Sequence, residues 1–198
     1  MKLILLFLIA AYCFSSITAC RNNITVSKVI AIQPYSDIDS SLTKKLYRQI
    51  KTLQPETVLL PPINLPLKAY MASRNRYRAD SLIRYLSQQT RADTVVIGLT
   101  GKDISTIKGK IRDWGVMGLG YCPGHACIIS SYRLSAINLN TQFYKVAIHE
   151  LGHTQGLKHC ANKTCFMRDA EGGNPLNEET GFCDLCKKIL IEKGWKLI

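Results

Sequence analysis

Two histidines spaced four residues apart, His149 and His153, lie in a segment that has the apolar spacing of a helix. The helix is expected over residues 141–153, so both side chains project from one face, one turn apart. Imidazole nitrogen is a common zinc ligand, and two imidazoles at this spacing can bind one ion. Gly156 ends the helix with a turn that a side chain would disfavour, and this turn brings His159 back as a third ligand.

Three protein ligands leave one zinc position open for water, as in catalytic zinc sites. Three of the four histidines in the chain take part in this motif, which makes an accidental set of surface histidines a poor explanation. Glu150 is adjacent to the first ligand and can reach the water without binding the metal. The motif therefore predicts hydrolysis of peptide bonds by a zinc-activated water, with Glu150 as the general base. The fourth histidine, His125, is expected in a loop and not as a ligand.

Four cysteines follow in two close pairs, Cys160 with Cys165 and Cys183 with Cys186. Two short pairs can supply the four thiolates of one tetrahedral, structural zinc site. Cys160 directly follows His159, so such a site would fix the position of the third histidine. Two disulfides are the alternative, because an exported chain meets oxidising conditions.

The stretch 149–186 resembles the archaemetzincin family of metzincin zinc peptidases. The resemblance rests on the three-histidine motif, on the cysteine that follows it, and on the spacing of Cys165, Met167, Cys183 and Cys186. Residues 74–86 and 131–134 are similar in a looser way. The spacer between Met167 and Cys183 is slightly shorter than in the family pattern.

This resemblance implies two zinc ions per chain, a catalytic ion on the histidines and a structural ion on the cysteines. It implies that Met167 packs beneath the histidines. It also suggests peptide substrates and a preference for free N-termini, for which Asp169 and Glu171 are the nearby carboxylates. Some metzincins carry a tyrosine at the position of Asp169 that stabilises the oxyanion, and this chain lacks it.

Buried strands alternate with amphipathic helices along the chain, which predicts an α/β (α+β) fold with a mixed, mostly parallel sheet. A small irregular C-terminal lobe should carry the cysteine site, and the substrate cleft should run between this lobe and the sheet. The strand at 126–130 is expected at the rim of the cleft, where an edge strand can pair with an extended peptide. The expected strands are 27–33, 57–60, 94–100 and 126–130, and the expected helices are 39–53, 76–89, 141–153 and 184–193, with loops and a short hairpin over 101–120.

The first nineteen residues have the layout of a secretory signal, with Lys2 before an apolar run at 3–12. The sequence Ile17-Thr18-Ala19-Cys20 resembles the lipobox of bacterial lipoproteins, in which the cysteine is acylated. We therefore expect a signal peptide at 1–19 and one peptidase domain at 20–198, held at the membrane of the bacterial cell envelope by lipid on Cys20. An uncleaved membrane helix and a plain secreted protein are the alternatives.

The chain has a formal net charge of +12. We interpret its clustered basic residues as solvated helix faces. The alternative is that they attract the protein to an anionic membrane surface. No nucleic-acid partner is expected, because no basic and aromatic motif is present. Two clusters hold many of these residues: Lys44, Lys45, Arg48 and Lys51, and Arg74, Arg76, Arg78 and Arg84.

The sequence leaves open an alternative function and one possible disulfide. A non-catalytic, zinc-stabilised lipoprotein that binds peptides or proteins would have no need of Glu150. Cys122 and Cys127 flank a Pro-Gly turn, and a disulfide between them is plausible in an exported chain.

Overall fold

The computed structural model describes residues 29–197. The expected signal peptide at 1–19 and the expected lipidation site at Cys20 lie outside the described residues. Within residues 29–197, none of the helices has the length and apolar character needed to span a membrane.

A five-stranded sheet forms the centre of the molecule, in the order β2-β1-β5-β9-β8. Strands β2, β1, β5 and β9 run parallel, and β8 is antiparallel to β9. The mixed, mostly parallel sheet predicted from the sequence is confirmed. The strands are β1 Val29–Pro34, β2 Val58–Leu59, β5 Thr94–Thr100, β8 Gly118–Gly120 and β9 Ala126–Ser130.

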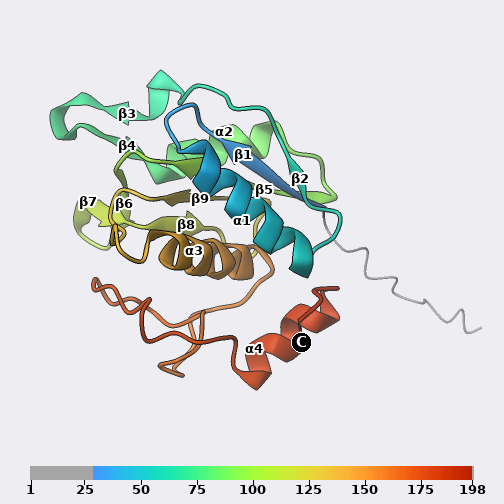
Figure 1. Ribbon diagram of the computed structural model, residues 1–198. Coiled ribbons are helices and arrows are strands. Elements are labelled where there is room, and N and C mark those ends of the chain that lie inside the picture. Colours follow the sequence, from blue (N-terminus) through green and yellow to red (C-terminus); the bar gives the residue numbers. More distant parts are fainter. Residues whose placement is uncertain (1–28, 198) are drawn as a thin grey trace, which may run out of the picture.

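Helices cover both faces of this sheet (Figure 1). Helices α1 (Ser40–Leu53) and α3 (Leu139–Thr154) pack on one face with Ile97 and Ile129, whereas α2 (Ala79–Gln88) packs on the other with Val96 and Ile128. Neighbouring strand residues face opposite sides of a sheet, which explains why these strands are apolar at nearly every position.

Helix α1 begins where the sequence predicts. Asp39 is its N-cap, and its carboxylate accepts a hydrogen bond of 2.7 Å from the backbone N–H of Leu42. Leu42, Leu46 and Ile50 are buried at helical spacing. The first basic cluster lies on the opposite, exposed face of α1, which agrees with its interpretation as a solvated helix face.

The prediction of a helix at 76–89 is wrong for its first three residues, because Arg76–Arg78 forms strand β4. Tyr77 pairs in parallel with Ile104 of a second sheet, and Arg76 forms ion pairs of 3.0 Å with Asp103 and 3.2 Å with Asp113. These distant partners hold the segment extended despite its helical apolar spacing. The second basic cluster is therefore partly an ion-pair network and not one helix face.

The second sheet has four strands in the order β3-β4-β6-β7. The sequence predicted loops with a short hairpin over 101–120 and no strand near residue 70. The strands are β3 Tyr70–Met71, β6 Ile104–Lys108 and β7 Ile111–Val116 with β4, and short 3-10 turns lie at Leu67–Ala69 and Ala72–Arg74.

The prediction that 126–130 is an edge strand is also wrong. Strand β9 lies between β5 and β8, and all five of its residues are buried. The edge is β8, whose Gly118 and Gly120 pair with Ile129 and Cys127. Glycine is a poor strand former, so the sequence pattern hid this strand inside an expected loop.

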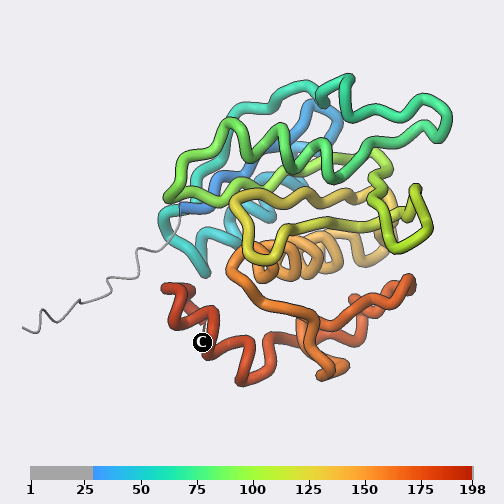
Figure 2. The backbone as a smooth tube through the Cα atoms, turned by 180° about the vertical axis from the view of Figure 1, so that it is seen from behind, coloured from blue at the N-terminus to red at the C-terminus, as the bar shows by residue number. Residues whose placement is uncertain are grey.

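After α3 the chain runs along the lower side of the molecule, drawn in orange to red in both views (Figures 1 and 2). This segment is irregular apart from α4 (Asp184–Glu192) and two short bridges, Cys160 to Arg168 and Cys165 to Gly181. The small irregular C-terminal lobe predicted from the sequence is thus present.

Candidate active site

A tight turn at the end of α3 brings the third histidine back towards the helix. Gly156 adopts a left-handed φ of 94°, which favours glycine. Its N–H donates to the carbonyl of His153 over 2.8 Å, and the N–H of Leu157 donates to that of Gly152 over 3.1 Å. This pair of bonds is the Schellman ending of a helix, and His159 follows three residues after the glycine.

The three imidazoles of His149, His153 and His159 lie together at the end of the turn. Their ring centroids are 4.6–5.4 Å apart. The Nδ1–H of His149 donates to the carbonyl of Phe166, and that of His153 to the carbonyl of Leu157, each over 2.7 Å. Because a carbonyl can only accept, these bonds place the proton on Nδ1 and leave the lone pair of Nε2 free.

The free nitrogen atoms of His149 and His153 face one another. Their Nε2 atoms are 3.0 Å apart, with no proton available for the space between them. Burial lowers the pKa of His149 to about 3 and also lowers the pKa of His153, so both rings are neutral near pH 7. Facing lone pairs repel unless a cation lies between them, and zinc binds neutral imidazole at about 2.0–2.1 Å. With His159, whose ligand atom lies within 4.8 Å of the others, the donor set fits zinc.

Glu150 lies on the same helix, buried against the edge strand β8. A Cβ atom on Gly118 would lie 2.6 Å from Glu150 Oε1, and one on Gly120 would lie 2.7 Å from the Glu150 carbonyl oxygen. The two glycines therefore make room for the glutamate. Burial raises the Glu150 pKa to about 8, although a hydrogen bond from the backbone of Gly120 opposes the shift.

Met167 packs beneath the histidine helix, as the sequence resemblance implied. It is fully buried, and a Cβ on Gly152 would lie 2.5 Å from its sulfur. Gly152 lies between the two helical histidines, so the methionine can approach the backbone only because that position has no side chain.

The four cysteines Cys160, Cys165, Cys183 and Cys186 form a second cluster. Their sulfur atoms all lie within 4.8 Å of one another, and those of Cys160 and Cys183 are 3.7 Å apart. A disulfide requires about 2.05 Å, whereas tetrahedral thiolates at about 2.3 Å from zinc lie near 3.8 Å apart. All four are free thiols, and their spacing fits zinc better than two disulfides.

Cys183 is also the N-cap of α4. A hydrogen bond from the backbone of Cys186 lowers its pKa, as expected for a thiol at a helix N-terminus. The backbone N–H groups of Met167 and Cys183 point to Cys165 Sγ at 3.5 and 3.4 Å. Burial raises the pKa of Cys165 and of Cys186. The surroundings therefore favour the thiolate at Cys183 alone, and a bound cation would be needed to hold the other sulfur atoms in that form.

Comparison with known proteins decides the family. The model of peptidase family M54 matches residues 26–192. The chain belongs to peptidase family M54. Together with the two donor sets, this makes it a zinc-dependent metallopeptidase with sites for two zinc ions.

Relatives and solved structures agree with this family. The archaemetzincin of Archaeoglobus fulgidus is 33% identical over 162 residues, which cover 79% of this chain and 95% of the relative. That of Methanocaldococcus jannaschii is 28% identical over 175 residues, which cover 83% and 94%. The crystal structure of the A. fulgidus archaemetzincin complexed with malonate matches with a TM-score of 0.70 at 30% identity, over 81% of this chain and 99% of that one.

The cleft of this M54 peptidase has a volume of about 650 Å³. It runs along β8 and α3 and is closed below by the segment after Met167. Gly118, Gly120 and Glu179 are among the lining residues that the sequence did not single out. Two glycines in one strand mark a close approach of another group, and this signal could have identified the first two.

Asp169 and Glu171, the suggested partners of a substrate amino group, both line the cleft. Asp169 already has partners: its Oδ2 lies 3.1 Å from His159 Nδ1, and its Oδ1 accepts a hydrogen bond of 2.9 Å from the N–H of Glu171. Glu171 is exposed.

Cys122 and Cys127 are free thiols, so the plausible disulfide between them is not present. Cys127 is buried within β9, while the Cys122 thiol donates to the carbonyl of Leu157 over 3.2 Å. His125 is exposed in the loop between β8 and β9.

Proposed function

We propose that His149, His153 and His159 hold the catalytic zinc, that the four cysteines hold the structural zinc, and that Glu150 is the general base. The observation that carries this proposal is the burial of the Glu150 carboxylate against Gly118 and Gly120, one residue from a zinc ligand. Zinc bound at the imidazoles supplies a Lewis acid and an acidified water, and its charge offsets the burial that raises the Glu150 pKa.

Glu150 takes the proton of the attacking water and passes it to the leaving amine. Its side chain is held in place by α3 on one side and the bare backbone of β8 on the other. Few alternative rotamers are therefore open to it, which keeps the carboxylate oriented towards the attack site.

The substrate in this proposal is an extended peptide that adds a strand to the edge of β8. Gly118, Leu119 and Gly120 line the cleft, and only one side of β8 pairs within the sheet, with β9. An edge strand offers free N–H and C=O groups to a peptide backbone. The scissile bond then lies beside Glu150 and the histidines.

Replacing Glu150 by Gln tests this assignment. General acid–base catalysis contributes roughly 10²–10⁴-fold, so hydrolysis of a cleaved peptide should fall by at least about 100-fold while zinc content stays at the wild-type value. Equal hydrolysis by the two proteins would assign the base to another group. A wild type that cleaves no peptide in a broad library, and a variant that still binds a partner, would favour a zinc-stabilised binding protein.

A preference for free N-termini is part of the proposal, because the sequence resemblance suggests it. It is tested with pairs of peptides that differ only in N-terminal acetylation. Loss of cleavage on acetylation supports an aminopeptidase, and equal cleavage at internal bonds identifies an endopeptidase.

Membrane attachment through Cys20 is a further part. It rests on Lys2, the apolar run at 3–12 and the lipobox-like residues before Cys20. Acyl mass on Cys20 in the membrane fraction, and release of Cys20→Ala but not of Cys122→Ser, would support an envelope lipoprotein. A soluble mature chain without acyl mass would contradict it.

A further inference from the structure

A buried carboxylate in the cleft wall has an oxygen without a partner. Glu179 is only 2% exposed, and it lines the cleft. Its Oε2 makes no hydrogen bond with any described residue. An unpaired buried acceptor is costly to the fold, because the carboxylate loses water and gains no donor in return.

The two cations whose charges act on Glu179 are engaged with other groups. Lys145 of α3 donates to the backbone carbonyls of Leu176 and Glu179 at 2.6 Å each, and Arg168 pairs with Glu178 at 2.6 Å. Burial raises the Glu179 pKa to about 7, while the charges of Lys145 and Arg168 reduce the shift and that of Glu178 adds to it. The cleft thus contains a carboxylate whose charge is poorly compensated.

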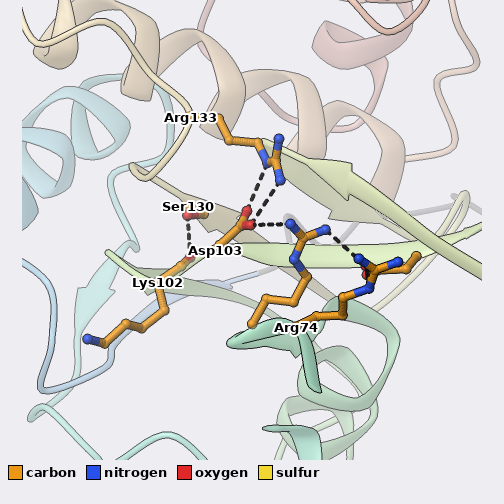
Figure 3. Close-up of polar contacts among 7 residues, drawn as sticks. Arg74, Lys102, Asp103, Ser130 and Arg133 are labelled. Carbon is orange, nitrogen blue, oxygen red and sulfur yellow. Dashed lines mark hydrogen bonds and ion pairs between the residues drawn. The ribbon is translucent and has the colours of Figure 1, made fainter. Parts of the chain in front are cut away.

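The other cations that line the cleft already have partners. Arg133 donates to both oxygens of Asp103 at 2.8 and 2.9 Å (Figure 3). Lys108 lies 4.9 Å from the ring centroid of Trp114. The Glu179 carboxylate therefore remains available to pair with a cationic group of a substrate.

Glu179 lines the same cleft as Glu150 and the three histidines. Lys145, which contacts its backbone, precedes the ligand His149 by four residues, about 6 Å along a helix. Val146 and Leu176 also line the cleft and offer apolar surface to the methylene stem of a long side chain.

We propose that Glu179 is the specificity-determining residue of this peptidase, and that it selects a lysine or arginine side chain beside the scissile bond. The side-chain stem lies along Val146 and Leu176, and the cationic group binds the Glu179 carboxylate. This inference rests on the proposed peptidase function and names its substrate class.

The test compares peptides that differ only in Lys, Arg, norleucine or Glu at the residues flanking the scissile bond. The zinc-loaded wild type should cleave the Lys and Arg peptides with a kcat/KM roughly 10- to 100-fold above the norleucine peptide, as expected for a charge-assisted hydrogen bond. Glu179→Gln keeps the shape and should remove most of that preference. Glu192→Gln removes a charge from an exposed residue of α4 that does not line the cleft, and it should leave the preference in place.

Binding separates specificity from turnover. In the Glu150→Gln background, the Lys peptide should bind more tightly than the norleucine peptide, and the ratio of the two affinities should grow as the pH rises through 7 and Glu179 ionises. If Glu179→Gln does not fold, the wild-type preference and its pH dependence decide the matter.

Equal kcat/KM for Lys and norleucine peptides would overturn the inference and leave the peptidase assignment intact. A loss of the same size for every peptide in Glu179→Gln, with a lowered melting temperature, would also overturn it, because the residue would then act on the fold alone. Absence of cleavage and binding for all peptides would instead overturn the proposed function.

Discussion

His159 Nδ1 lies 3.1 Å from Asp169 Oδ2, so the third imidazole is oriented by a carboxylate, whereas the other two are oriented by backbone carbonyls. Both members of this pair are about half exposed. The tight turn at Gly156 returns the chain but does not fix the ring of His159. Asp169 holds Nδ1 of this ring, which leaves Nε2 as the nitrogen available to a metal ion.

Replacing Asp169 by Ala should weaken the catalytic zinc site by roughly 10- to 100-fold, the usual effect of losing a group that orients a ligand. Competition with a chelator measures this affinity without reference to activity. Asp169→Asn should restore part of the affinity because the amide oxygen can still accept from Nδ1. Glu171→Gln is the control, because it removes a nearby charge that does not contact the His159 ring. An equal loss of zinc affinity in this variant would show that the effect comes from negative charge near the site and not from orientation of the ring.

The glycines of β8 give a second prediction. Gly118→Ala places a methyl group against the Glu150 carboxylate, whereas Gly120→Ala places one against the Glu150 carbonyl oxygen and 3.2 Å from its Oε2. In both variants the carboxylate must shift relative to the attack site. We expect kcat to fall by roughly 100-fold, since misplacement by about 1 Å can have that effect, with zinc content unchanged. Gly181→Ala is the matched control, because nothing lies within 4 Å of its added Cβ. Unchanged kcat in both β8 variants would mean that Glu150 can function in another position.

The cysteine cluster is expected to contribute directly to stability. Cys183→Ser removes one thiolate but keeps a residue suited to the N-cap of α4, and binding energy at a structural zinc site is folding energy. Zinc content should fall from two ions to one per chain, with a clear drop in melting temperature. Cys122→Ser, a free thiol outside the cluster, should keep both ions. Two ions in Cys183→Ser would show that the thiolates are not the second site.

Local patterns predicted the parts of this site that depend on nearby residues. The spacing of His149 and His153 on one helix, the stop at Gly156 and the return of His159 all follow from rules that span eleven residues or fewer. The strands with continuous apolar runs were found for the same reason.

The parts that the sequence did not reveal depend on distant contacts. Arg76 is extended because Asp103 and Asp113 bind it from another strand, and no local rule contains those partners. Strand β8 exists because it pairs with β9, although its glycines disfavour a strand. Glu179 reaches the cleft through a contact with Lys145, thirty-four residues earlier.

The last prediction concerns the pH dependence of folding, measured in a His153→Ala background. That variant should lose the catalytic zinc and keep the thiolate site filled, because the two sites share no ligand. Retention of both ions at unchanged affinity would contradict the proposed histidine site. Without the catalytic ion, no metal charge opposes the burial of Glu150, and its raised pKa should appear in the stability of the protein.

The folded-state pKa of Glu150 is raised from 4.5 to about 8, so between these values the folded protein holds a proton that the unfolded chain has released. The stability contributed by the protonated carboxyl is therefore complete below about pH 4.5 and is lost as the pH rises towards 8. The loss approaches about 1.4 kcal/mol per pH unit. Glu179 also makes folding less stable as the pH rises, but over a narrower range, because its pKa is raised from 4.5 to about 7. Buried His149 has the opposite effect below pH 6.5: its pKa is lowered in the folded protein, so stability increases as the pH rises. Glu179 and His149 are present in both His153→Ala and His153→Ala/Glu150→Gln, so their effects cancel when the two proteins are compared.

Denaturant unfolding at pH 6 and at pH 7.5 measures the effect of Glu150. The free energy of unfolding should fall by roughly 1–2 kcal/mol between these pH values in His153→Ala, and this fall should be absent in His153→Ala/Glu150→Gln. Parallel curves would mean that the Glu150 carboxylate is solvated once the metal is gone, and that the close packing against Gly118 and Gly120 depends on the bound ion.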